Sequence, residues 1–192
     1  MGSPPAQAGK AELRRQFRAR RRQLLMAAEP LLQARAGLEL PPLLRGGGCL
    51  GIYWPLPGEV DLRGLAESPH LHQRLALPRV CDGTMRYLRW RPGDPLQADA
   101  TGIPAPATGD PLPPGQLAVL LAPALAFDRS GYRLGYGGGW FDRLRSQPDW
   151  DRVTALAVLP AGCLVQNLPA DPWDVPFAGW LDETGLHWLQ AV

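Results

Sequence analysis

The feature that most constrains this chain is residues 124–144, in which an apolar strand pattern runs into a glycine-rich loop and then into a helix. An apolar run over 117–125 precedes the loop, and a helix-compatible segment over 140–145 follows it. Between positions 131 and 139, five of the nine residues are glycine, namely Gly131, Gly135, Gly137, Gly138 and Gly139. Glycine costs backbone entropy on folding, so this density requires a reason. A loop whose bare N–H groups hold an anion at a helix N-terminus would provide one, and a plain glycine-rich surface loop is the alternative.

The composition weakens this glycine signal and strengthens another. The 192 residues include 22 glycines and 22 prolines, and all but one of the 20 Lys and Arg residues are arginine. A bias of this kind is typical of a GC-rich coding background, which produces glycine-rich and arginine-rich segments without functional meaning. The single lysine, Lys10, therefore stands out as a candidate functional residue, unless it survived by chance near an exposed end.

Length and composition are those of a single globular domain, 1–192, with 1–9 as a flexible tail. No apolar run is long enough to span a bilayer, and the first nine residues lack the hydrophobic core of a signal peptide. The three cysteines show neither zinc spacing nor a disulfide framework, and each is expected to be a buried thiol. We therefore expect a cytoplasmic protein, monomeric and without a membrane partner. The cysteines are Cys49, Cys81 and Cys163.

A basic helix is predicted over 10–28, where no Gly or Pro interrupts residues of high helix propensity. Residues 10–22 carry a net charge of +6, which leaves −4 for the rest of the chain. An apolar stripe at helical spacing should face the protein, and three cations on its rim should point into a cleft. The stripe is Leu13, Phe17 and Leu24, and the rim cations are Lys10, Arg14 and Arg21.

Three other arginines of this helix, Arg15, Arg18 and Arg22, should face solvent. A basic amphipathic helix can bind nucleic acid, so a non-catalytic binding protein is the alternative function. No aromatic or Gly-Arg interleaving follows the helix, and the remainder of the chain is acidic. We therefore expect no nucleic-acid partner.

The rest of the chain alternates strand and helix patterns, which predicts an α/β three-layer fold with a largely parallel sheet flanked by helices. The run over 117–121 is the most apolar strand and should be central, and 91–115 should be a long Pro-rich loop with a stiff arm at 102–106. Further helices are predicted over 30–44 and 62–71, and a short helix or turn over 163–169. Further strands are predicted over 49–53, 74–80, 85–90, 153–159, 179–181 and 186–189.

Polar side chains follow the predicted strand 49–53, where an α/β sheet places its ligands. Glu59 and Asp61 lie just beyond it, next to Trp54. A carboxylate beside an aromatic ring suits a flat, amine-bearing heterocycle. Alternatively, Glu59 opens the next helix as an N-terminal anion.

Common phosphate-binding motifs do not describe the glycine loop. No Gly-Lys-Ser/Thr follows the glycines, so the loop is not a P-loop, and the register of the dinucleotide fingerprint fails after Gly137. The three histidines show no ligand pattern. The loop is therefore either a less common phosphate motif or structural.

The ordered residues of 124–143, Ala-Leu-Ala-Phe-Asp followed by Gly-Tyr-Arg-Leu-Gly-Tyr-Gly-Gly-Gly-Trp-Phe-Asp-Arg, resemble the signature of the 5-formyltetrahydrofolate cyclo-ligase family. Other segments extend the resemblance over nearly the whole chain. These are Lys10 with Leu13-Arg14, Tyr53 to Asp61, Gly102-Ile-Pro and 166–174.

The resemblance implies a Rossmann-like sheet of the sugar-isomerase and CoA-transferase type, and an ATP- and Mg²⁺-dependent reaction. ATP would phosphorylate the formyl oxygen of 5-formyltetrahydrofolate, with or without a polyglutamate tail, and N10 would then close the ring. Such a reaction depends on positioning and charge neutralisation. The implied residue roles are as follows: Lys10, Arg14, Gly135, Tyr136, Gly137, Gly138, Gly139, Trp140 and Phe141 for ATP; Asp142 and Asp174 for Mg²⁺; Trp54, Glu59 and Trp140 for the folate; and Arg133 and Lys10 for catalysis.

Four positions depart from the family pattern. The family's tyrosine pair is Trp140-Phe141, a basic residue of the glycine run is Gly138, and a glutamate of the 102–106 arm is Ala105. Stacking on the pterin survives these changes, whereas a phenolic hydrogen bond does not. We expect activity to be retained with weaker folate binding.

Overall fold

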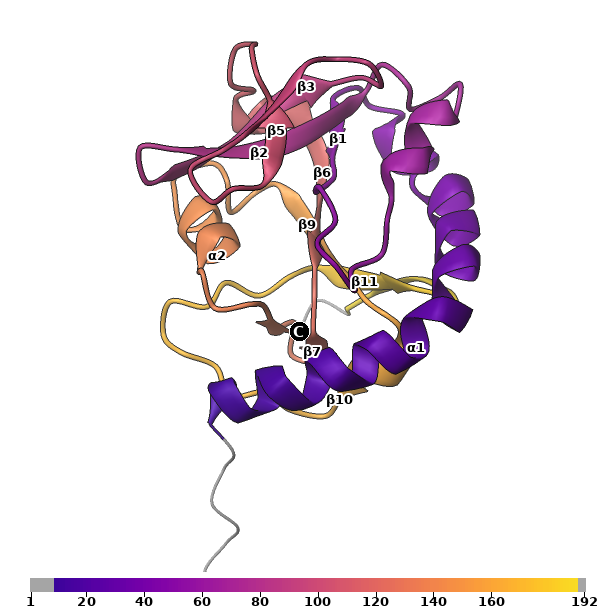
Figure 1. Ribbon diagram of the computed structural model, residues 1–192, viewed down its shortest axis with the longest axis vertical. Coiled ribbons are helices and arrows are strands. Elements are labelled where there is room, and N and C mark those ends of the chain that lie inside the picture. Colours follow the sequence, from indigo (N-terminus) through magenta and orange to yellow (C-terminus); the bar gives the residue numbers. More distant parts are fainter. Residues whose placement is uncertain (1–8, 190–192) are drawn as a thin grey trace, which may run out of the picture.

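The computed structural model of the protein describes residues 9–189, so most of the predicted tail over 1–9 lies outside the described residues. Its centre is a seven-stranded sheet with the order β12-β11-β9-β6-β1-β2-β3 (Figure 1). The four inner pairs are parallel and the two outer pairs are antiparallel, which confirms a mostly parallel α/β fold with β6 in the middle. The strands are β1 (Cys49–Gly51), β2 (Leu75–Cys81), β3 (Thr84–Trp90), β6 (Leu117–Pro123), β9 (Thr154–Val158), β11 (Gly179–Asp182) and β12 (Gly185–Trp188).

The N-terminal region forms one helix, α1 (Lys10–Glu39), so the prediction of two separate helices was wrong. Pro30 lies inside the helix, and Figure 1 shows that the two halves of α1 run in different directions. Proline removes a backbone donor and bends a helix without always ending it. The second half continues because Leu32 and Ala36 are buried against the sheet. A 3₁₀ turn, η1 (Pro41–Leu44), follows.

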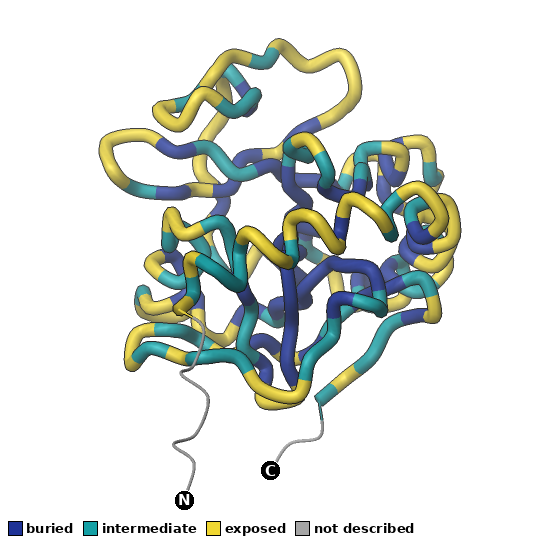
Figure 2. Tube along the Cα trace, turned by 60° about the horizontal axis from the view of Figure 1, so that its bottom comes forward, coloured by how far each residue is buried: buried dark blue, intermediate teal, exposed yellow. Residues whose placement is uncertain are grey.

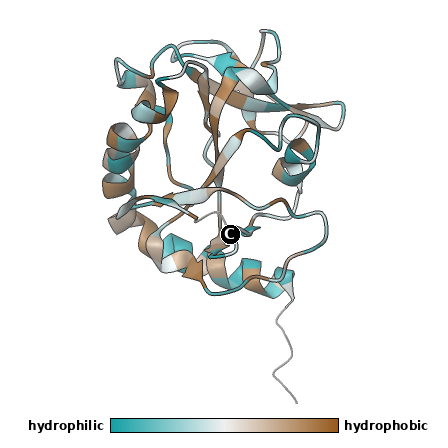
Figure 3. Cartoon of the chain, turned by 180° about the vertical axis from the view of Figure 1, so that it is seen from behind, coloured by the Kyte–Doolittle hydropathy of each residue, from teal (hydrophilic) through white to brown (hydrophobic). Residues whose placement is uncertain are grey.

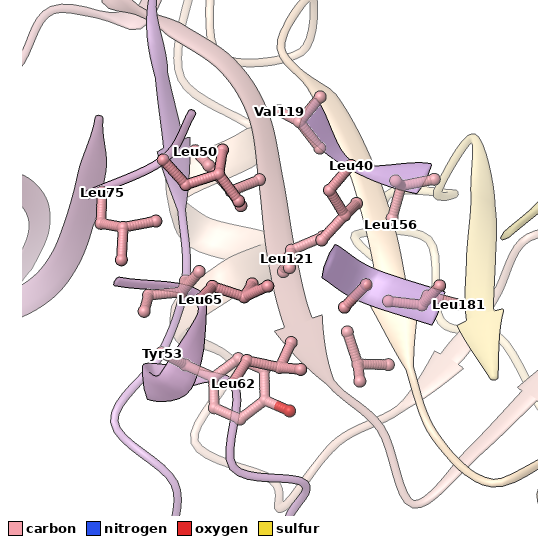
Figure 4. Packing of buried hydrophobic residues seen from close by; sticks show 14 of the residues in the cluster. Leu40, Leu50, Tyr53, Leu62, Leu65, Leu75, Val119, Leu121, Leu156 and Leu181 are labelled. Atoms are coloured by element: carbon pink, nitrogen blue, oxygen red, sulfur yellow. The ribbon is translucent and has the colours of Figure 1, made fainter. Parts of the chain in front are cut away.

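Two hydrophobic clusters cover the two faces of the sheet. The first joins the second half of α1 to inward side chains of β1, β6, β9 and β11 (Figure 4). The second joins the opposite face to α2 (Trp140–Arg145) and to buried side chains of connecting segments, including Phe127 and Trp150. Figure 2 shows the central strands as buried and the connecting loops as largely exposed, and Figure 3 shows hydrophobic residues concentrated on the same strands. Phe17 and Leu24 from the first half of α1 also pack against this second cluster, so helices contribute to the cover of both faces.

A small second sheet, with the order β10-β7-β8, supports the glycine-rich stretch. Its strands are β7 (Ala126–Asp128), β8 (Arg133–Leu134) and β10 (Leu164–Val165). Leu13 and Phe17 of α1 pack on this region, as the predicted apolar stripe required. The strands themselves were missed, and β10 replaces part of the expected helix or turn over 163–169, because strands of two or three residues have no readable periodicity.

Three further segments differ from the sequence-based expectations. The loop over 91–115 contains a hairpin, β4 (Leu96–Ala98) with β5 (Pro104–Pro106), and ends in η3 (Pro114–Gln116). The segment predicted as a helix over 62–71 forms only η2 (Arg63–Glu67), and η4 is Ala161–Cys163. Cys49 and Cys163 are buried as expected, but Cys81 ends β2 with its side chain exposed. Within residues 9–189, no helix combines the length and apolarity needed to cross a membrane.

Candidate active site

One pocket of about 580 Å³ collects the predicted site residues from four separated parts of the chain. The first half of α1, the segment after β1, the glycine loop with α2, and the 168–174 loop all contribute to its lining. Residues far apart in sequence therefore meet at one site. The predicted residues that line it are Lys10, Arg14, Trp54, Glu59, Arg133, Gly135, Tyr136, Gly137, Gly138, Gly139, Trp140, Phe141, Asp142 and Asp174.

The glycine loop takes a backbone conformation that favours glycine at two points. Gly137 has φ +104°, and Gly139 has φ +64° as the residue that precedes α2. Both values lie in the left-handed region, where a Cβ is strained. A Cβ on Gly137 would also lie 3.3 Å from Cζ of Arg14, whose Nε donates a 3.0 Å hydrogen bond to the carbonyl of Gly135. The loop is thus fixed against α1 by the side chain predicted to bind ATP.

Lys10 holds two carboxylates of the 168–174 loop. Its Nζ lies 2.6 Å from Oδ2 of Asp171 and 2.6 Å from Oδ2 of Asp174. Burial lowers the pKa of Lys10, but the hydrogen bonds to Asp171 and Asp174 outweigh that effect and raise its pKa above the ordinary value. The first turn of α1 is therefore tied to a loop more than 160 residues away.

Arg133 lies beneath the glycine loop with its side chain only 8% exposed. Its Nη1 donates to the carbonyl of Pro123 at 2.8 Å, its Nη2 lies 3.9 Å from Oδ2 of Asp142, and its Nε finds no partner among residues 9–189. Burial lowers the pKa of Arg133, and the neighbouring Asp142, Glu59 and Asp174 oppose that effect. The guanidinium is a buried positive charge with a donor left for a ligand.

Glu59 is buried at the other end of the pocket, with 5% of its surface exposed. Its Oε2 accepts a 2.8 Å hydrogen bond from the N–H of Leu56, while Oε1 finds no donor within the described part of the chain. Burial raises the pKa of Glu59, and the bond from Leu56 only partly opposes it. A buried acceptor without a partner costs free energy unless a ligand supplies the donor. Of the two readings of Glu59, this geometry favours the ligand-binding one, and no helix begins there.

Two tryptophans that line the pocket, Trp54 and Trp140, each have an arginine stacked on the ring. The guanidinium carbon of Arg63 lies 4.3 Å from the ring centroid of Trp54, and that of Arg143 lies 4.3 Å from the ring of Trp140. A Cβ on Gly138 would lie 2.9 Å from Cδ1 of Trp140. Gly138 and Trp140 are two of the departures from the family pattern. The absence of a side chain at 138 thus leaves room for the ring of Trp140.

Two charged residues that the sequence associated with the site have structural roles. Asp128, which ends the Ala-Leu-Ala-Phe-Asp segment before the glycine loop, is buried and accepts backbone N–H bonds from Ser130, Tyr132 and Leu168. Arg21 points inward as predicted, but its guanidinium bonds the carbonyl of Ala124 and the hydroxyl of Tyr136. Both residues thus stabilise the glycine loop and the segments next to it through hydrogen bonds within the protein.

The solvent-facing arginines lie as predicted. Arg15, Arg18 and Arg22 are exposed, and Arg15 pairs with Glu12 at 2.8 Å.

Sequence reasoning missed Asp171 and Trp173 as pocket residues. Trp173 is 68% exposed at the rim. Both lie in the segment whose Asp174 was identified, so the carboxylate-bearing turn over 171–174 was the available signal. The predicted arm over 102–106 contributes Ile103 to the lining, and Thr101 lines the pocket just before it, whereas Ala105 is fully buried.

The two predicted magnesium ligands face the same pocket from different elements. The side chains of Asp142, in the first turn of α2, and Asp174 are 23% and 20% exposed. Across residues 9–189, no three His, Cys, Asp or Glu side chains gather as a metal cluster. Magnesium is commonly held by one or two carboxylates together with phosphate oxygens and waters, so the donor set fits.

Known proteins resemble this chain over most of its length. Residues 6–180 match the model of the 5-formyltetrahydrofolate cyclo-ligase family. The 5-formyltetrahydrofolate cyclo-ligase of Escherichia coli K12 is 31% identical over 83% of this chain and 92% of its own length. That of Haemophilus influenzae is 33% identical over 66% of this chain and 71% of its own.

Solved structures show the same fold. The NMR structure of Aquifex aeolicus 5,10-methenyltetrahydrofolate synthetase matches with a TM-score of 0.74 at 29% identity, covering 95% of this chain and 94% of that one. The Mycoplasma pneumoniae 5,10-methenyltetrahydrofolate synthetase matches with a TM-score of 0.67 at 19% identity, covering 92% and 99%, which supports the fold alone.

Proposed function

The chain belongs to the 5-formyltetrahydrofolate cyclo-ligase family, and from this premise we propose that the pocket between α1, the glycine loop and the 168–174 loop is its active site. The enzyme is an ATP-dependent ligase that converts 5-formyltetrahydrofolate to 5,10-methenyltetrahydrofolate with release of ADP and phosphate. The formyl oxygen accepts the γ-phosphoryl group, N10 attacks the activated carbon, and phosphate leaves.

The observation that carries the assignment is Oε1 of Glu59, which finds no donor in the described part of the chain and is buried in the same pocket that the glycine loop borders. A pterin presents amine and ring N–H donors at the edge of a flat ring. Glu59 accepts from that edge, and Trp54 packs against the ring face. The carboxylate thereby gains the hydrogen bonds that the protein does not provide.

Lys10, Arg14 and the backbone N–H groups of 135–139 hold the triphosphate at the other end. Lys10 reaches the pocket from the first turn of α1, and Arg14 already contacts the loop. The glycines keep side chains away from the phosphate oxygens. This arrangement fixes the γ-phosphoryl group relative to a formyl oxygen on a pterin anchored at Glu59, which is the positioning that the reaction requires.

Arg133 and Lys10 neutralise the charge that develops on the transferring phosphoryl group. Arg133 is held rigidly through Pro123 and lies in a site of low solvent exposure, where a fixed positive charge acts strongly. Asp142 and Asp174 would hold Mg²⁺, which when bound neutralises the triphosphate.

The test is the absorbance of 5,10-methenyltetrahydrofolate in reactions with purified protein. We expect product only when ATP and 5-formyltetrahydrofolate are both present, with one ADP formed per product. ATP binding without any product would contradict the proposal. ATP hydrolysis at the same rate without folate would also contradict it.

A further inference from the structure

The ammonium of Lys10 occupies a position between two carboxylates, and the two carboxylates differ in what else they contact. Oδ2 of Asp174 accepts both Lys10 and the backbone N–H of Asp171 at 2.8 Å. Among residues 9–189, Oδ2 of Asp171 accepts a hydrogen bond from Lys10 alone, and the side chain of Asp171 is 41% exposed compared with 20% for Asp174. Asp174 is therefore the more enclosed of the pair, and Asp171 lies nearer to solvent.

Binding of a divalent cation at Asp174 conflicts with the arrangement of Lys10. An ammonium 2.6 Å from a carboxylate oxygen stands where a cation on that oxygen would be, and like charges at such separations repel strongly in a partly buried site. A cation on Oδ2 of Asp174 displaces Lys10 and a cation on Oδ1 repels it, so in both cases the ammonium shifts toward another anionic partner. Asp171 already supplies one, at the same 2.6 Å distance.

We propose that Asp171 is a positioning residue that retains the ammonium of Lys10 when Asp174 passes to Mg²⁺. This inference rests on the proposed function, which assigns Mg²⁺ to Asp142 and Asp174. Lys10 then contacts Asp171 alone instead of both carboxylates. This contact keeps the ammonium in the pocket and directed at the phosphates. Without Asp171, Lys10 would lose both partners on metal binding and would sample solvent conformers.

The sequence makes this exchange directly observable, because Lys10 is the only lysine. Protein labelled with [ε-¹³C]lysine gives a single ¹³C–¹H methylene signal, which reports only on Lys10. The experiment titrates this signal with MgCl₂ alone, up to tens of millimolar, in the wild type, Asp171→Asn and Asp174→Asn.

In the wild type we expect the signal to move with a saturable dependence on Mg²⁺ toward its position in Asp174→Asn. In Asp174→Asn it should not move. In Asp171→Asn it should move instead to the position of a free, exposed lysine. A wild-type signal that does not move over this range would overturn the proposal, as would identical end points in the wild type and Asp171→Asn.

Kinetics provide a second readout that a structural role of Asp171 would not produce. In Asp171→Asn the KM for MgATP should rise about tenfold with a small change in kcat, because the loss is one charge-assisted contact. Asp171→Glu should bring the KM for MgATP most of the way back to the wild-type value. A fall in kcat with an unchanged KM for MgATP, without rescue by glutamate, would contradict the inference.

Failure of this inference differs from failure of the proposed metal site. If Asp174→Asn keeps the wild-type Mg²⁺ dependence of turnover, the metal assignment is wrong and the exchange is wrong with it. If Asp174→Asn loses that dependence while the Lys10 signal of the wild type ignores Mg²⁺, only the exchange is wrong.

Discussion

The two ends of the pocket hold charge in opposite ways. At the proposed phosphate end, Lys10 and Arg14 already have partners within the protein, in Asp171, Asp174 and the carbonyl of Gly135. At the proposed pterin end, Glu59 is buried, and one of its oxygens finds no donor among residues 9–189. A ligand at the phosphate end therefore replaces contacts that Lys10 and Arg14 already make within the protein. A ligand at the pterin end instead supplies a hydrogen-bond donor that Glu59 lacks.

This difference indicates how each end contributes to binding. Exchange of partners gives a small net gain per contact, so the phosphate end needs several contacts to hold a nucleotide. A missing partner is costly in the free protein, so a single amine at Glu59 recovers a large share of the binding energy. Substitutions at the two ends should accordingly affect different parameters.

The largest effect should come from Lys10→Ala, which would remove the proposed phosphate contact and catalytic charge and leave Asp171 and Asp174 without their ammonium partner. We expect kcat/KM for ATP to fall by about 100-fold or more, from the loss of roughly 3 kcal/mol of charge-assisted bonding. Steady-state kinetics with saturating folate measure this. Arg15→Ala, an exposed cation of the same helix, is the control and should leave turnover unchanged; equal effects would remove Lys10 from the site.

Next in size is Glu59→Gln, which should raise the KM for 5-formyltetrahydrofolate roughly 10- to 100-fold. The KM for ATP should change little, because the substitution lies at the other end of the pocket. Glu67→Gln, at an exposed carboxylate that ends η2, is the control. A Glu59→Gln enzyme with an altered KM for ATP alone would reverse the assignment of the two ends.

The same substitution should change the pH dependence of stability. Burial raises the pKa of Glu59 in the folded state above the ordinary 4.5, so this group favours folding below that value and its contribution is lost as pH rises through the folded pKa. A glutamine at position 59 does not ionise, so its contribution to stability is not lost as pH rises. The free energy of unfolding of Glu59→Gln relative to the wild type should therefore increase from about pH 4.5 upward and then level off. Urea unfolding between pH 4.5 and 8 checks this, and a constant difference would show that the carboxylate is not desolvated.

A smaller effect is expected from Gly137→Ala. The φ of +104° and the 3.3 Å approach to Arg14 oppose a Cβ, at a cost of about 1–2 kcal/mol. The KM for ATP should rise by roughly 5- to 30-fold while the KM for folate stays constant. Gly64→Ala, where no atom lies within 4 Å of the added Cβ, is the control. If Gly137→Ala and Gly64→Ala change the KM for ATP equally, the loop does not require the left-handed backbone conformation at residue 137.

The smallest effect is expected from Phe141→Tyr, which restores a phenol where the family pattern has one. Phe141 lines the pocket, and its ring centroid lies 5.0 Å from the guanidinium carbon of Arg133. A new hydrogen bond adds about 1 kcal/mol, so the KM for folate should fall by no more than about fivefold. Isothermal titration with 5-formyltetrahydrofolate measures the affinity directly, and weaker binding would show that the ring edge has no room for a hydroxyl.

The sequence was most informative where order along the chain carries the chemistry. The glycine stretch with Arg133 and Asp142 could be predicted because the site is built from consecutive residues. Lys10 could be found because composition isolates it. Asp171 could not, because its role depends on α1 lying against a loop more than 160 residues away.

Other errors have local physical causes. A carboxylate beside a glycine loop resembles a ligand in sequence, but the oxygens of Asp128 are used by backbone N–H groups, one of them 40 residues distant. Pro30 indicated a helix end, yet the buried positions Leu32 and Ala36 outweigh one lost hydrogen bond. Two-residue strands such as β8 depend on tertiary pairing and have no sequence pattern.

The contact between Lys10 and Asp174 also has a consequence for biosynthesis. During translation, the first turn of α1 leaves the ribosome long before residues 171–174 have been made, and the pocket cannot close until they emerge. The strand β11, which extends the parallel part of the sheet, follows directly after them. Nascent chains stalled before residue 174 should therefore bind no nucleotide, however much of the glycine loop they expose, and competence for ligand should arise late, as a single event.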